Sequence, residues 1–118
     1  NIWLILESMR IFNNEDYYGN IEYKRYFNQK DKHRCEKYTT QLNFRVNEGG
    51  GKAIYLIGVN DDGSIYGLSD TDISINIKYL EIMCRQLDFS IKIIMRCSFN
   101  NNKFIIARIC SNNFKEIF

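Results

Sequence analysis

Residues 48–70, EGGGKAIYLIGVNDDGSIYGLSD, constrain the fold of this 118-residue chain more than any other segment. Three consecutive glycines end whatever precedes them, and an apolar run follows over residues 53–59. Asp62 and Gly63 then form a turn signal, because a type I′ turn needs positive φ and glycine adopts it without strain. We therefore predict a β-hairpin whose second strand spans residues 65–68.

Four residues in and beside this turn are assigned structural roles. Asp62 and Gly63 make the turn itself. Gly58 and Gly67 flank it inside the two predicted strands, where the missing side chain permits a bulge or the close approach of another backbone. We interpret the segment as a buried central hairpin and not as a ligand site.

Length and composition match one ordinary globular domain, with 45% hydrophobic and 25% charged residues. The formal net charge is only +2, so charge alone requires neither a nucleic-acid nor a membrane partner.

The four cysteines are widely spaced and the chain has one histidine, a set that does not form a zinc-binding framework. We expect all four to be reduced core thiols of a cytoplasmic protein.

Hydrophobic periodicity predicts the other elements. Apolar residues at helical spacing predict a short N-terminal helix over 1–12 and a longer one from Asp31 to the glycines. Ser69 precedes Asp72 as in a capping box, and apolar residues then recur at 4-3-4-3 spacing up to Leu87, which predicts the most regular helix. The remaining strands are predicted at 20–27, 90–99 and 103–110.

These elements predict an α+β fold. Its mixed or antiparallel sheet has about five strands in the order β-α-β-β-α-β-β, and two helices pack on one face. A polar stretch follows the N-terminal helix, so we divide the chain into a helix and linker at 1–18 and a single α+β domain at 19–118.

None of the familiar catalytic motifs is complete. Lys52 follows Gly51 as in a phosphate-binding loop, but Val46 and Ala53 depart from that motif, and the glycines lead into a strand. His33 is the single imidazole and falls on a charged helix start, so no nucleophile–histidine pair is formed. We therefore expect no catalytic residue and no metal site.

Several short motifs together resemble a known family. They are GNIEYK at 19–24, TQLNFR at 40–45, EG at 48–49, AIYLIGV at 53–59, the residues Asp61, Gly63, Gly67 and Leu68, LEIM at 80–83 and IKIIM at 91–95. Over about residues 19–110 the chain resembles the region upstream of the GTPase domain in GTP-binding proteins 1 and 2, the elongation-factor-like translational GTPases.

This resemblance implies a non-catalytic N-terminal accessory domain of a longer cytoplasmic protein. The full-length protein would bind and hydrolyse GTP with magnesium, whereas the family's phosphate, magnesium and guanine motifs lie beyond this chain. No cofactor is therefore implied for the segment itself. The implied partners are its own GTPase domain and the ribosome, tRNA or mRNA, with no membrane.

A second, more distant likeness is carried by EYK at 22–24 and GVNDDG at 58–63. These are similar to the AlbA-like domain of schlafen proteins, some of which are metal-dependent ribonucleases with three carboxylates. Of the three carboxylate positions only Glu22 matches, since Tyr17 and Asn60 occupy the others. The likeness implies a nucleic-acid-binding module as an alternative, and a carboxylate nuclease as a third reading. If Glu22 binds no metal, we expect it to be a surface carboxylate at the end of the strand, paired with Lys24 or Arg25.

Candidate nucleic-acid-binding residues cluster around the end of the first predicted strand and the start of the following helix. They are Tyr23, Lys24, Arg25, Lys30, Lys32 and Arg34. Cations beside aromatic rings are suited to a phosphate backbone and to stacked bases. The same run carries Glu22, Asp31 and Glu36, and such mixed charge is also typical of a solvated edge that docks on protein.

Overall fold

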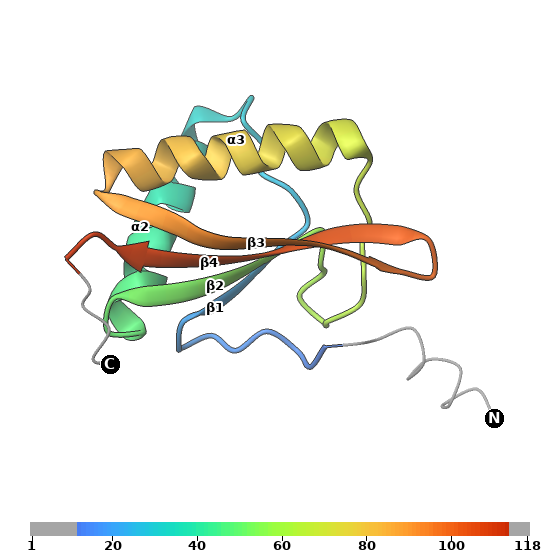
Figure 1. Ribbon diagram of the computed structural model, residues 1–118, viewed down its shortest axis with the longest axis horizontal. Helices are drawn as coiled ribbons and strands as arrows, with labels where there is room; N and C mark the ends of the chain where they lie inside the picture. The colour runs from blue at the N-terminus through green and yellow to red at the C-terminus, as the bar shows by residue number, and fades with distance from the viewer. Residues whose placement is uncertain (1–11, 114–118) are drawn as a thin grey trace.

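In the computed structural model, which describes residues 12–113, two helices cover one face of a four-stranded mixed sheet (Figure 1). The strands are β1 (Ile21–Lys24), β2 (Lys52–Ile57), β3 (Phe89–Phe99) and β4 (Asn102–Ser111). The helices are α2 (Lys32–Glu48) and α3 (Asp70–Gln86). The strand order is β1-β2-β4-β3, with β1 parallel to β2 and the other neighbours antiparallel. The predicted α+β class with two helices on a mixed sheet is confirmed.

The prediction of a fifth strand at residues 65–68 is wrong within the described part of the chain. The returning segment pairs with the chain just after β2, through an isolated bridge between Val59 and Ile65 and through hydrogen bonds to the Gly58 carbonyl, and forms no strand. Both edges of β2 are already occupied, by β1 and by β4, so no hydrogen-bonding edge is left for a returning strand. The backbone N–H of Leu68 instead donates to the carbonyl of Lys103 as the chain leaves toward α3. The predicted N-terminal helix lies outside the described residues, apart from Phe12.

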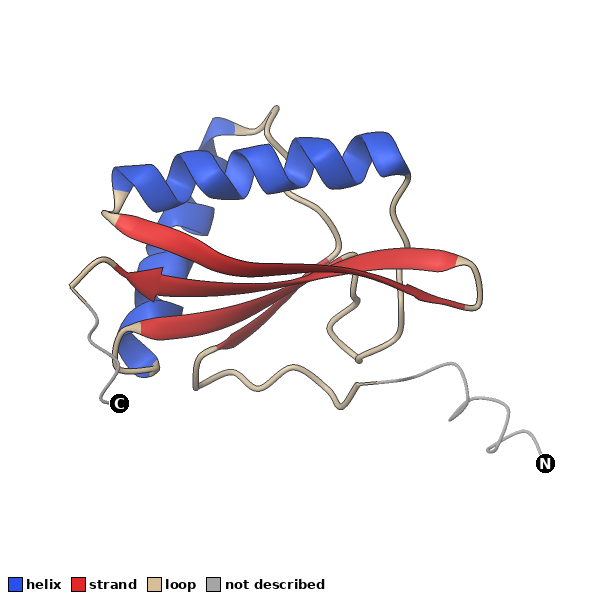
Figure 2. Cartoon of the chain, viewed as in Figure 1, coloured by secondary structure: helices blue, strands red, loops and turns tan. Residues whose placement is uncertain are grey.

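The main hydrophobic core lies between the sheet and both helices (Figure 2). Leu42 of α2 and Leu80 of α3 are buried against Ile57 and Ile105 of the sheet. The opposite face, here called the open face, carries a smaller cluster that includes Tyr23 and Phe104. The chain segment 12–20, here called the strap, contributes to that cluster through Phe12. The centre of the Phe12 ring lies 6.3 Å from that of Tyr23 and 5.7 Å from that of Phe104.

Both helices begin at the residues that the sequence predicts. The Asp31 side chain accepts from the backbone N–H groups of His33 and Arg34, and the Ser69 hydroxyl accepts from the N–H of Asp72 at 3.1 Å. One stabilising contact could not be foreseen. The buried Asn76 side chain accepts from the Phe27 N–H at 2.7 Å and so fixes the chain after β1 to α3.

The four cysteines are free, but they do not share one environment. Cys84 and Cys110 are buried, and burial raises the pKa of the Cys84 thiol to about 12. Cys35 and Cys97 are partly exposed, so the prediction that all four lie in the core is wrong. Cys97 belongs to the open face, which neither α2 nor α3 covers. No helix within residues 12–113 is both long enough and apolar enough to cross a membrane.

Candidate nucleic-acid interface

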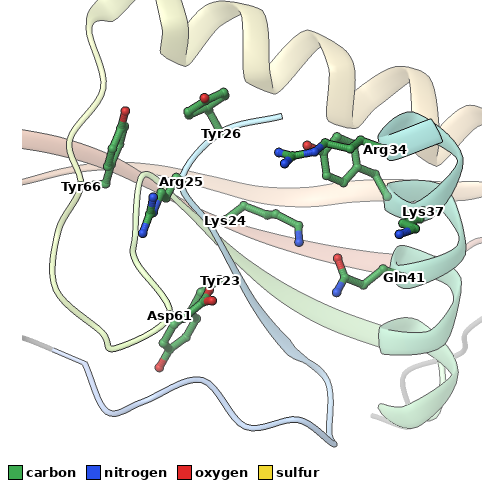
Figure 3. A pocket seen from close by; sticks show the side chains of 10 residues that line it. Tyr23, Lys24, Arg25, Tyr26, Arg34, Lys37, Gln41, Asp61 and Tyr66 are labelled. Atoms are coloured by element: carbon green, nitrogen blue, oxygen red, sulfur yellow. The ribbon is translucent and has the colours of Figure 1, made fainter. Parts of the chain in front are cut away.

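A cleft of about 490 Å³ opens between the end of β1, the first half of α2 and the loop that follows β2 (Figure 3). We call it the basic cleft. It is lined by Tyr23, Lys24, Arg25, Tyr26, Arg34, Lys37, Tyr38, Gln41, Asp61 and Tyr66. These described residues include four cationic side chains and one carboxylate, so the cleft is far more basic than the chain as a whole.

Local structure explains why these side chains meet. Arg34, Lys37 and Gln41 are three or four residues apart on α2 and therefore share one face of that helix. On the other side, the loop after β2 turns sharply at Gly63, whose φ is +88°, and then presents Tyr66 to the cleft. Figure 3 shows Arg25 between Tyr66 and the α2 side chains.

Cations and aromatic rings are in contact along the cleft. The Lys24 ammonium lies 5.5 Å from the centre of the Tyr38 ring, and the Arg25 guanidinium lies 5.8 Å from that of Tyr66. The rings of Tyr26 and Tyr66 are 6.0 Å apart between centres. Such pairs keep the long cationic side chains extended beside the rings. The cleft can therefore present positive charge and aromatic surface together.

The structure separates the predicted candidates into three groups. Lys24, Arg25 and Arg34 all line the basic cleft. Tyr23 reaches it only at the edge, because its ring is buried on the open face and its hydroxyl donates to the Asn13 carbonyl at 2.8 Å. Lys30 belongs to an adjacent hollow, and Lys32 is an exposed residue of the first turn of α2.

Sequence reasoning missed half of the cleft. The helical spacing of residues 34, 37 and 41 would have identified Lys37 and Gln41. No local signal links Asp61 and Tyr66 to β1, because the loop is brought there by the fold. The four structural residues of that loop lie where the chain reverses: Asp62 accepts from the Ser64 N–H, and the glycines at 58, 63 and 67 all have positive φ.

A buried ion pair joins Glu22 of β1 to Arg45 of α2. Glu22 is only 1% exposed, and its Oε1 accepts from Nε of the equally buried Arg45 at 2.9 Å. Its Oε2 lies 3.1 Å from the Lys24 ammonium. Arg45 also donates to the backbone carbonyls of Gly19 and Asp16 at 2.8 Å each. The prediction that Glu22 is a surface carboxylate is therefore wrong, although its pairing with Lys24 is correct.

The donor set near Glu22 does not favour the nuclease reading. Both oxygens of Glu22 are engaged by cations, so they are poorly placed to hold a divalent metal. Within residues 12–113, no three side chains of the His, Cys, Asp or Glu type are grouped to bind a metal ion. Asn60 uses its amide to donate to the Ser64 hydroxyl in the turn.

Glu15 ties the strap to the sheet. Its carboxylate accepts from the Tyr23 backbone N–H and lies 3.9 Å from Nη2 of Arg45. Desolvation raises the pKa of Glu15 to about 7. It outweighs the hydrogen bond from the Tyr23 N–H, which lowers this pKa, and the negative charge of nearby Glu22 raises it further. The strap is further held by two backbone bonds, from Phe12 N–H to Gly63 and from Glu15 N–H to Asp61.

The raised pKa of Glu15 predicts how its contribution to stability varies with pH. The folded state keeps a proton that the unfolded chain loses above its ordinary pKa of 4.5, so this contribution is complete below 4.5 and is lost as pH rises through about 7. Glu15→Gln is expected to become more favourable relative to the wild type from about pH 5 to about pH 8. Urea unfolding of both proteins at each pH measures this difference. A difference independent of pH would contradict the assignment.

Comparison with known proteins relates the chain to GTP-binding proteins. No known protein-family model matches it. It is 33% identical over 103 residues to Uncharacterized protein R625 of Acanthamoeba polyphaga mimivirus, a match that covers 86% of this chain and 55% of that protein. It is 36% identical over 76 residues to GTP-binding protein 2 of Homo sapiens, covering 64% of this chain and 13% of that protein. It is 38% identical over 47 residues to GTP-binding protein 1 of Xenopus laevis, covering 40% and 7%.

The predicted relationship to GTP-binding proteins 1 and 2 is thus confirmed at the level of a related region. The chain spans about half the length of the mimivirus protein and a small part of the GTP-binding proteins.

Proposed function

We propose that this chain is a non-catalytic accessory domain of a GTP-binding, elongation-factor-like protein, and that it contacts RNA through the basic cleft. The similarity to a region of GTP-binding proteins 1 and 2 supports the first part. The second part rests on one observation, the four cations and the exposed tyrosines that line a single cleft. In this proposal the GTPase domain, ribosome, tRNA and mRNA are partners of the longer protein.

Charge distribution favours a polyanion as the ligand of the cleft. The chain has 16 basic and 14 acidic residues, yet four of those cations and one acid line the cleft. A concave surface of one sign concentrates field lines and attracts an oppositely charged chain. Two of the cations are already engaged in ion pairs, Lys24 with Glu22 and Arg34 with Asp31. Arg25 and Lys37 are exposed and are therefore the most informative to replace.

Binding of a fluorescently labelled single-stranded RNA, followed by anisotropy, tests the proposal. Two to four of these cations neutralise phosphates, the lower number counting only Arg25 and Lys37, so affinity is expected to fall roughly 7- to 50-fold between about 50 and 200 mM salt. The double variant Arg25→Ala/Lys37→Ala is expected to bind roughly 10-fold more weakly at low salt, and to show a shallower salt dependence.

Lys78→Ala/Arg85→Ala is the matched control. Both residues are exposed on α3, and their loss changes the net charge by the same amount. This control should bind RNA like the wild type. The proposal fails if the wild type shows no salt-dependent binding, or if both double variants weaken binding equally.

A further inference from the structure

A second hollow adjoins the basic cleft, and Tyr26 lines both. The second hollow has a volume of about 510 Å³ and is lined by Tyr26, Phe27, Asn28, Gln29, Lys30 and Ile75. Resting on the proposed RNA function, we infer that the ligand is an unpaired RNA strand that passes from the basic cleft over Tyr26 into the second hollow. Its bases stack on Tyr26 and Tyr66.

The two tyrosines are placed as a stacking platform. Tyr26 is 45% exposed and Tyr66 is 47% exposed, and their rings lie at 41° to each other with centres 6.0 Å apart. Neither ring belongs to a hydrophobic core formed by residues 12–113, so exposed aromatic surface is retained next to four cations. A base has a π-face whatever its identity, and stacking on such rings is tolerant of sequence. In a duplex those faces are covered by neighbouring base pairs.

The backbone that follows Tyr26 is fixed to both helices. The next residue, Phe27, is buried and donates its N–H to Asn76 at 2.7 Å. The N–H of Asn28 donates to the hydroxyl of Tyr38 at 3.0 Å. Tyr26 is therefore presented on a segment anchored to α2 and α3, which lowers the entropy lost when a base stacks on it.

The second hollow is lined by side chains that can bind the next nucleotide of the strand. Asn28 and Gln29 bring side-chain amides, which can hydrogen-bond the edges of a base. The Asn28 oxygen already accepts from the Lys30 N–H at 3.2 Å, so Asn28 offers its amide N–H groups. The exposed Lys30 adds a cation for the next phosphate, and the half-exposed Ile75 adds an apolar wall. In this inference, Lys30 and the cleft cations contact different phosphates of the same strand.

Affinities for a six-nucleotide single strand and for a duplex of the same sequence test the inference, using the full chain and anisotropy. The single strand is expected to bind more tightly. Tyr26→Ala and Tyr66→Ala are each expected to weaken its binding roughly 5- to 150-fold, with the salt slope unchanged. The corresponding phenylalanine variants should retain binding, because they keep the ring. Tyr18→Ala is the control, since Tyr18 is 71% exposed and lines neither hollow.

Lys30→Ala tests the path of the strand. It should weaken binding of the six-nucleotide strand but not of a dinucleotide that fills the basic cleft alone. Equal binding of duplex and single strand, or tyrosine variants that bind like the wild type, would overturn the inference while salt-dependent binding still supports the proposed function. Absence of binding to either RNA would overturn the proposed function itself.

Discussion

Replacing Arg45 with alanine is expected to lower the free energy of unfolding by about 3–5 kcal/mol, because it leaves the buried carboxylate of Glu22 without its closest counter-charge. Both side chains are almost completely buried, and Nε of Arg45 donates to Glu22 at 2.9 Å. The same guanidinium also donates to two strap carbonyls, which would lose their partner. Urea unfolding at neutral pH measures the change.

Two further variants separate the ion pair from other effects. Arg85→Ala removes an exposed arginine from α3 and should change stability by less than about 0.5 kcal/mol. The double variant Glu22→Met/Arg45→Met replaces the buried pair with apolar groups and should recover much of the loss. If Arg45→Ala is no more destabilising than Arg85→Ala, the buried pair does not stabilise the fold as described.

Gly63→Ala is expected to be a second strongly destabilising change. Gly63 has a φ of +88°, and a Cβ there would lie 2.0 Å from the carbonyl oxygen of Phe12 and 2.7 Å from that of Asn13. The substitution therefore strains the turn and pushes the strap away from it. We expect a loss of about 1–2 kcal/mol from the left-handed backbone and of about 1–3 kcal/mol more from the steric overlap.

Gly50→Ala is the matched control for Gly63→Ala. Gly50 also has a positive φ, +64°, but a Cβ there meets no atom of residues 12–113 within 4 Å. Its stability loss therefore reports backbone strain alone, and the difference between the two variants in urea unfolding reports the steric overlap. Faster proteolysis within residues 12–20 of the Gly63 variant would locate the damage in the strap. Equal losses in the two variants would contradict the close packing of the strap on the loop.

Local sequence signals predicted those parts of the fold that local interactions determine. Ser69 and its partner Asp72 specify the start of α3, and positive φ at Asn100 and Asn101 joins β3 to β4 as their turn preference suggests. The Asp62-Gly63 signal correctly located a chain reversal but could not show that both edges of β2 are taken by other strands.

The sequence likewise predicted only part of the candidate site. Lys24 and Arg25 are close in sequence to the helix that completes the cleft, so their clustering was visible. Glu22 and Arg45 are 23 residues apart, and their burial as a pair depends on the packing of α2 against β2 and β4. Tyr66 reaches the cleft through a loop whose path is set by tertiary contacts, which periodicity does not encode.

The bonds between the strap and the loop after β2 make two segments mechanically dependent on each other. The backbone N–H groups of Phe12 and Glu15 donate to the carbonyls of Gly63 and Asp61. The same loop carries Tyr66, which forms one wall of the basic cleft. Tension that lifts the strap would therefore loosen that wall. By thermodynamic reciprocity, a ligand that favours the ordered wall also strengthens the attachment of the strap by the same free energy. A contact or force that displaces the strap therefore changes the affinity of the basic cleft for its ligand.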